Sequence, residues 1–156
     1  MTVEDILKIK GKVVCMVTPD ETALGLAEKL RAKRIGAIVV STDGIRIDGI
    51  VSERDLAFGL AEHVTKLPMV TVDQLMSRNV FVCSPEDTIC NVMRIMTSRR
   101  VRHLPVKKDD HLVGILSIRD ILEYRLKEIA LESAVLRDVI ALGGNRVPDH
   151  VAERKI

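Results

Sequence analysis

A short motif that could bind a phosphorylated ligand occurs twice in the sequence. It reads glycine, two apolar residues, serine, a variable residue, arginine and aspartate, at 49–55 and again at 114–120. Each copy follows a β-branched run and begins a helical pattern, where free backbone N–H groups and the helix dipole favour an anion. The glycine would let a ligand approach the backbone, the serine and arginine could contact phosphate, and the aspartate could accept from two ribose hydroxyls. The candidate side chains are Ser52, Arg54 and Asp55 in the first copy and Ser117, Arg119 and Asp120 in the second.

The same spacing also has a purely structural interpretation. A serine followed three residues later by an acidic residue is a capping arrangement at a helix start, and its net contribution to stability is about 1 kcal/mol. Duplication copies caps as readily as binding sites, so the second copy does not decide between them. The motif alone therefore leaves both interpretations open.

The motif is the end of a longer repeat, and the repeat predicts the elements that position it. Each copy begins with a Thr-Pro or Ser-Pro turn and continues with apolar residues at i, i+3, i+4 and i+7, which predicts an amphipathic helix. Two β-branched strands separated by a polar turn then lead into the motif. Thr22 and Thr88 are the expected N-caps of the two helices. The matching segments are 17–22 with 83–88, 23–30 with 89–96, 35–40 with 101–106, and 49–56 with 114–121.

Each unit is therefore expected to be a three-stranded sheet with two helices, in the α/β (α+β) class. Because a sheet of this size is marginal alone, we expect the two units to pack with pseudo-twofold symmetry around one core. The lead-in segments 2–7 and 71–76 match as well. The predicted organisation is a first unit with an N-terminal helix at 1–66, a second unit at 67–124, a C-terminal helix at 125–143 and a polar tail at 144–156.

These residues resemble the CBS domain family, in the tandem arrangement called a Bateman module. The resemblance runs from Val3 to about Tyr124, and its most specific marks are the two Gly-Ile-x-Ser-x-Arg-Asp segments and Arg-x-x-x-Leu-Pro-Val at 100–106. Stand-alone bacterial CBS domain proteins are similar along their length. The resemblance implies regulatory binding of an adenine nucleotide, namely AMP, ADP, ATP or NAD(H), or of S-adenosylmethionine, in two clefts between the units.

Carried over from the family, each cleft joins the Ser-x-x-Asp segment of one unit to the turn and second strand of the other. Backbone groups of the strand would read the adenine edge. One cleft would use Ser117, Arg119 and Asp120 with Thr18, Ala23, Ile35, Gly36 and Ala37. The other would use Ser52, Arg54 and Asp55 with Ser84, Val101, Arg102 and His103.

Two departures from the family pattern concern the clefts, and the second of them predicts that the clefts are not equivalent. Arg119 stands where related proteins often have glycine, so it would either add a phosphate contact or crowd the site. The segment 36–39 lacks the Leu-Pro that occurs at 104–105.

Composition excludes several other classes. The 156 residues contain 24 basic and 22 acidic side chains, two Phe, one Tyr and no Trp, which disfavours nucleic acid as a partner. No apolar run approaches the roughly 20 residues of a membrane span, and residues 1–10 lack a secretory signal, so we expect a cytoplasmic protein. The three cysteines lack metal-ligand or redox spacing, and no P-loop or dinucleotide fingerprint is present, so neither a metal site nor an enzyme is predicted.

The C-terminal helix carries a narrow apolar seam that predicts a homodimer. The seam residues advance by four and three positions with one polar interruption, as in a heptad. They are Leu122, Leu126, Ile129, Ser133, Leu136 and Ile140. The alternative is that the helix folds back over its own module.

Three functions remain, and they differ in how well the sequence supports them. The first is an adenine-nucleotide sensor that reports to a separate, unidentified protein partner by a change of shape. The alternative is an adaptor that binds no ligand, with a nucleic-acid-binding CBS protein as a weaker third reading.

Overall fold

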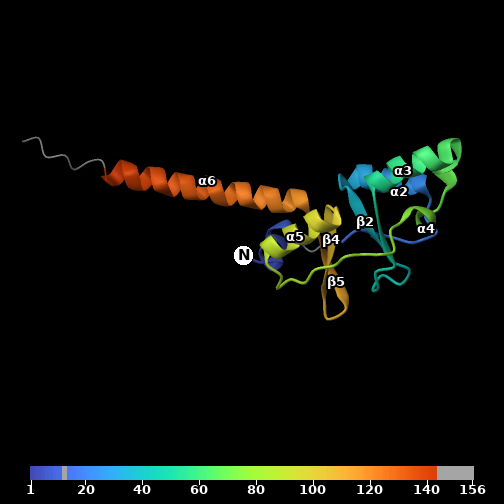
Figure 1. Cartoon of the computed structure of the whole chain (residues 1–156), viewed down its shortest axis with the longest axis horizontal. Coiled ribbons are helices and arrows are strands. Elements are labelled where there is room, and N and C mark those ends of the chain that lie inside the picture. The colour runs from blue at the N-terminus through green and yellow to red at the C-terminus, as the bar shows by residue number, and fades with distance from the viewer. Residues whose placement is uncertain (12–13, 144–156) are drawn as a thin grey trace, which may run out of the picture. The chain divides into compact units, whose positions relative to one another are not determined.

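The first unit is an α/β arrangement around a small mixed sheet. The computed structural model describes residues 1–11 and 14–143. In the sheet, β1 pairs parallel with β2, and β2 pairs antiparallel with β3. Helices α2 and α3 contact each other, as Figure 1 shows. The elements are β1 (Met16–Val17), α2 (Ala23–Lys33), β2 (Ala37–Val40), β3 (Gly49–Ser52), α3 (Glu53–His63) and a following 3-10 helix η1 (Val64–Met69).

The second unit repeats this order with a smaller sheet. Its two strands form an antiparallel hairpin, closed by a turn in which Asp109 and Asp110 both have positive φ, as a two-residue hairpin turn of this hand requires. The third strand that the repeat predicts is reduced to a single parallel bridge between Cys83 and Val106. The elements are α5 (Ile89–Arg99), β4 (His103–Lys108), β5 (His111–Ser117) and α6 (Ile118–Gly143).

The expected caps are present at the first helix of each unit. The Thr22 hydroxyl accepts from the Gly25 backbone N–H at 3.2 Å, and the Thr88 hydroxyl accepts from that of Asn91 at 3.3 Å. Both helices end at an arginine in the left-handed conformation, with φ of 53° at Arg34 and 55° at Arg100. The chain therefore leaves the first helix of each unit with the same backbone conformation.

The two lead-in helices cross between the units. Helix α1 (Val3–Lys10) precedes the first unit in sequence, but its first turn donates backbone hydrogen bonds to the carbonyls of Pro85 and Asp87 in the second. Helix α4 (Val72–Leu75) precedes the second unit and hydrogen-bonds to Pro19 and Glu21 of the first. The N-terminal helix that the sequence groups with the first unit is thus bonded to the second.

This crossing explains the glycine in each repeated motif. A Cβ atom on Gly114 would lie 2.7 Å from a methyl carbon of Leu7, and one on Gly49 would lie 2.6 Å from the sulfur of Met76. Each glycine therefore makes room for a lead-in side chain. The expectation that these glycines admit a ligand to the backbone is corrected, because a side chain of the chain itself occupies that space.

The core of the first unit is built from the apolar faces of these elements. Strand β2 is buried along its whole length, as expected for the middle strand of a covered sheet. Val72 of α4 is fully buried with the first unit, so the crossing lead-in belongs to this core. The cluster consists of Val17, Leu26, Leu30, Ile38, Val40, Val51, Val72 and Met76.

Helix α6 is continuous over 26 residues, from Ile118 to Gly143. The predicted boundary between a unit ending at 124 and a separate helix at 125–143 is therefore not a break in secondary structure. By contact density, 1–121 form one compact body and the part from Leu122 onward forms another. The expected polar tail, 144–156, and the side chain of Ile140 lie outside the described residues.

Candidate functional site

The two Ser-x-x-Asp segments both form capping boxes, as the structural interpretation predicts. Asp55 accepts at Oδ2 from the Ser52 backbone N–H at 2.7 Å and from its hydroxyl at 2.6 Å. Asp120 accepts in the same way from Ser117, at 2.7 Å for both donors. Because these bonds converge on Oδ2, a ribose hydroxyl would meet the Oδ1 atom of each aspartate. Capping and ligand binding are therefore geometrically compatible.

Each capping box opens into a cleft lined by the other unit. The first, which we name cleft A, has a volume of about 340 Å³, within the usual range of small-ligand sites. It brings the start of α6 against the link between α2 and β2. Its predicted residues are Ile35, Gly36, Ala37, Ser117, Arg119 and Asp120, and its further lining residues are Lys10, Arg34, Glu53, Arg102, His103, Ile115 and Ile118.

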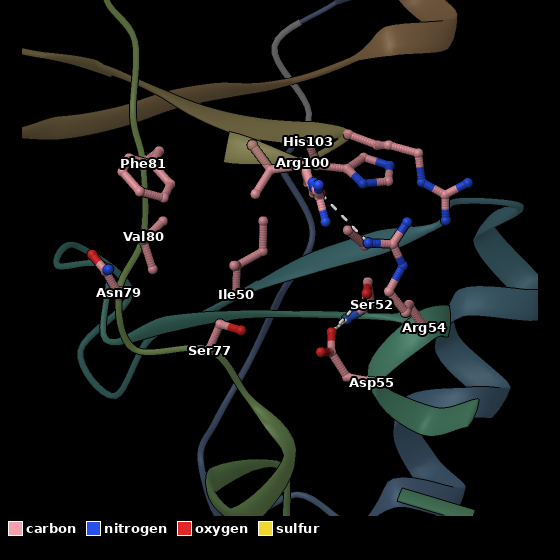
Figure 2. Close-up of a pocket in the computed structure, with 13 residues that line it drawn as sticks. Ile50, Ser52, Arg54, Asp55, Ser77, Asn79, Val80, Phe81, Arg100 and His103 are labelled. Carbon is pink, nitrogen blue, oxygen red and sulfur yellow. Dashed lines mark hydrogen bonds between the residues drawn. The ribbon is translucent and has the colours of Figure 1, made fainter. Parts of the chain in front are cut away.

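The second, cleft B, joins the start of α3 to the link between α5 and β4 and has a volume of about 150 Å³ (Figure 2). Across it, the Arg54 guanidinium donates to the Arg100 carbonyl at 3.5 Å. Its predicted residues are Ser52, Arg54, Asp55, Val101, Arg102 and His103, and its further lining residues are Ala37, Ile50, Ser77, Asn79, Val80, Phe81 and Arg100. The two clefts thus differ in size, in line with the predicted inequivalence.

Three predicted site residues lie outside both cleft walls. Thr18 caps a turn, where its hydroxyl bonds to the Asp20 carboxylate and lowers the pKa of that group. Ala23 is buried and donates its N–H to the Val70 carbonyl of the crossing lead-in. Ser84 donates its N–H to Asp87 and lines a separate surface hollow beside Cys83. The lead-in helices donate backbone hydrogen bonds to these turns, at Pro19 next to Thr18 and at Pro85 next to Ser84.

The crossing lead-ins supply the cleft residues that the sequence does not reveal. Lys10 comes from the last turn of α1 and reaches cleft A, while Ser77 and Asn79 follow α4 and line cleft B (Figure 2). Nothing in the order of the chain places Lys10 beside Asp120, which lies 110 positions later. The matched lead-in segments 2–7 and 71–76 were the available signal, but they do not specify which unit each one contacts.

Lys10 forms an ion pair with Asp120 in the wall of cleft A. Its Nζ lies 2.7 Å from Asp120 Oδ2 and also donates to the Ile115 carbonyl at 2.9 Å. Burial would raise the pKa of Asp120, but the hydrogen bonds from Lys10 and Ser117 outweigh it and hold that pKa below its ordinary value. Asp120 is therefore a carboxylate at neutral pH, paired with a cation from another element.

His103 lies at the boundary of the two clefts and lines both. Burial lowers its pKa, the cations Arg102 and Lys10 lower it further, and Asp120 and Glu53 oppose them. The ring is therefore neutral at pH 7, with one nitrogen able to donate and the other able to accept.

Within the part of the chain that the structure describes, no helix is long and apolar enough to cross a membrane. In the same residues, no three histidine, cysteine, aspartate or glutamate side chains lie close enough together to hold a metal ion.

Fold and clefts together define a tandem pair of small α/β units with paired inter-unit sites, and the chain belongs to the CBS domain family. The CBS domain model matches twice, at residues 3–62 and 72–127. Both matches begin at a lead-in helix, so the family unit includes the segment that crosses.

Individual relatives agree with this assignment. A CBS-domain containing protein from Agrobacterium tumefaciens has a solved structure that is 38% identical, with a TM-score of 0.77 over 80% of this chain and 99% of that one. An uncharacterised 33.4 kDa protein of Thermofilum pendens is 38% identical over 67% of this chain. The matched region covers only 34% of the length of that protein. The CBS domain pair of protein MJ0100, crystallised with 5-methylthioadenosine and S-adenosyl-L-methionine, shares the fold at 23% identity, with a TM-score of 0.72 over 82% of this chain and 98% of that one.

Proposed function

We propose that this protein is a regulatory, non-catalytic module that binds an adenine nucleotide in clefts A and B and signals to a separate partner by a change of shape. The observation that carries the proposal is that each Ser-x-x-Asp helix start faces the other unit across a cleft. A ligand held there contacts both units, so its binding depends on how they are arranged. The ligand class is AMP, ADP, ATP or NAD(H).

The chemistry of the cleft walls supports this ligand class. Each cleft presents a helix start and an adjacent arginine, Arg54 or Arg119, to a phosphate group. Each presents an aspartate whose Oδ1 would accept from a ribose hydroxyl. The apolar walls, Ile35 with Ile115 in cleft A and Val80 with Val101 in cleft B, suit the faces of an adenine ring. That MJ0100 was crystallised with two adenosine compounds indicates that this fold accommodates such ligands.

The shared wall supplies a physical route from one cleft to the other. Ala37, Arg102 and His103 line both. A ligand that moves β2 against β4 in one cleft would alter the other, but it would shift the population only by its difference in affinity for the two arrangements. We therefore expect the two binding events to be coupled.

One observation favours an adaptor that binds no ligand. Both aspartates already have partners within the chain, since each accepts two hydrogen bonds from its serine. The boxes therefore have a complete structural role without any nucleotide. Sensor and adaptor share this geometry and differ only in whether a ligand binds.

We further propose that the protein is a homodimer held through α6. The seam residues Leu122, Leu126, Ile129 and Leu136 are between 52% and 66% exposed in the single chain, and exposed apolar rows of this kind pair in coiled coils. Leu131 and Val135 are also exposed but lie off the seam, so they would remain outside a two-helix contact.

Thermal unfolding of the ligand-stripped protein tests the function directly. The panel is AMP, ADP, ATP, NAD, NADH, S-adenosylmethionine and GTP. A ligand at a hundredfold excess over its Kd stabilises the native state by about 2.7 kcal/mol. A selective rise in Tm with an adenosine compound supports the sensor, and GTP serves as the purine control. A flat response across the panel favours the adaptor.

A further inference from the structure

The two clefts differ in what the crossing lead-in contributes. In cleft B the lead-in residues are uncharged: Ser77, Asn79, Val80 and Phe81. In cleft A the lead-in contributes Lys10, whose side chain is 34% exposed and reaches the cleft from the last turn of α1. The lead-in contribution to the two clefts thus differs by one charged side chain.

The broken symmetry is visible at a matched pair of backbone carbonyls. The Ile50 carbonyl in β3 accepts from the Ser77 backbone N–H at 2.9 Å. Among the described residues, the corresponding Ile115 carbonyl in β5 accepts from Lys10 Nζ, at the same distance. A side-chain ammonium therefore stands in cleft A where a backbone amide stands in cleft B.

The two clefts have the same net formal charge. Four cationic side chains and two carboxylates line cleft A, in addition to neutral His103, whereas three cationic side chains and one carboxylate line cleft B. Cleft A differs in that Lys10 is paired directly with its aspartate. The ammonium of Lys10 neutralises Asp120, which would otherwise repel an anionic ligand bound beside it. The carboxylate keeps its Oδ1 for a ribose hydroxyl, because Lys10 bonds to Oδ2.

We infer that Lys10 is the residue that makes cleft A select for the phosphate charge of its ligand. This inference rests on the proposed nucleotide binding and concerns the phosphate end of the ligand in cleft A. Lys10 would act on the phosphates through its charge, so its removal should change the ratio of AMP to adenosine affinity and leave adenosine binding in place.

The test uses the full chain with cleft B disabled by Arg54→Ala and Asp55→Ala, so that binding reports on cleft A. Titration calorimetry then compares adenosine, AMP and ADP in this parent and in its Lys10→Gln derivative. The matched control is Lys8→Gln, which removes the same charge from the same helix. Lys8 lies outside the lining of cleft A, pairs with Glu4 at 3.7 Å and is 64% exposed.

We expect Lys10→Gln to lower the AMP-to-adenosine affinity ratio by about tenfold, as for one unit charge acting on a dianion across several ångströms of partly screened space. The loss should be larger for ADP, and Lys8→Gln should change the ratio by less than about twofold. A ratio unchanged by Lys10→Gln, or lowered equally by both variants, would overturn the inference while leaving the proposed function intact. A parent that binds neither adenosine nor AMP, although its circular dichroism is native, would overturn the inference and leave cleft B as the only cleft in which the proposed function could operate.

Discussion

The two capping aspartates are chemically alike, but they should contribute unequally to stability. Asp55→Asn weakens the hydrogen bonds to Ser52 and removes a negative charge from the first turn of α3. Loss of such a cap and charge costs about 1 kcal/mol. Asp120→Asn does the same at α6 and also leaves Lys10 without its carboxylate partner. This ion pair is half-buried, with 17% of the Asp120 side chain and 34% of the Lys10 side chain exposed.

An ion pair at that depth is expected near the upper end of the surface range, at about 1 kcal/mol. Asp120→Asn should therefore lower the free energy of unfolding by about 2 kcal/mol, against about 1 kcal/mol for Asp55→Asn. Urea unfolding of the ligand-stripped proteins at pH 7.5, followed by circular dichroism, measures both. Because both variants retain side-chain size, differences in packing do not contribute.

A double-mutant cycle isolates the ion pair from the cap. Lys10→Met should show a coupling energy of about 1 kcal/mol with Asp120→Asn and none with Asp55→Asn, which lies in the other cleft. Equal costs for the two aspartate variants, together with coupling below about 0.3 kcal/mol, would refute the assignment of Lys10 to Asp120.

Three further outcomes follow from the burial and charge of single groups. Burial raises the pKa of the Cys83 thiol to about 12. A thiol reagent should therefore label exposed Cys90 in the native protein and reach Cys83 only on unfolding. Rapid labelling of Cys83 in the native protein would contradict this burial. The pKa of His103 is lower in the native protein than in the unfolded chain, so the unfolded chain binds a proton at this residue first as the pH falls below about 6.5. The free energy of unfolding should therefore decrease between pH 7.5 and 5.5. His103→Gln should make that decrease smaller. Truncation after Tyr124 removes most of the exposed seam of α6 and should shift the sedimentation mass from dimer to monomer; an unaltered dimer would assign the contact to the CBS units.

The sequence predicted the elements of each unit because their signals are local. The apolar spacing of α2 and α5 and the threonines at their starts depend on neighbours within one or two turns, and Thr22 and Thr88 are confirmed as caps. The CBS family and the α/β class are confirmed for the same reason, since the repeat preserves these local patterns twice. Local order, however, does not determine which unit a connecting helix packs against.

The parts that sequence reasoning missed are contacts over long separations. Hydrogen bonds from α1 to Pro85 and Asp87 join residues more than 80 positions apart, and no pattern in either segment specifies them. The third strand of the second unit was also overestimated, because Cys83 is bonded on both sides to β4 but its neighbours do not extend the ladder. A strand of one residue has no periodicity for a sequence to show.

The residues of the repeated motif lie together in a cleft wall, whereas Thr18 and Ser84 of the turns lie outside both cleft walls. The serine, arginine and aspartate of each motif line their clefts because one helix start holds all three. Thr18 and Ser84 do not, because the lead-in helices bond to the backbone next to them. The family resemblance predicted that each Ser-x-x-Asp segment faces the turn and the second strand of the other unit. The contacts of the lead-in helices determine which residues of those segments line a cleft.

The crossing also connects the fold to the proposed signalling. Helix α1 is bonded to one unit and its Lys10 extends into the cleft that unit shares with the other. Movement of β2 against β5 would therefore change the surroundings of Lys10 and Asp120 together. A nucleotide in cleft A would thus act on the position of the N-terminal helix, which makes that helix the element whose displacement a partner could detect.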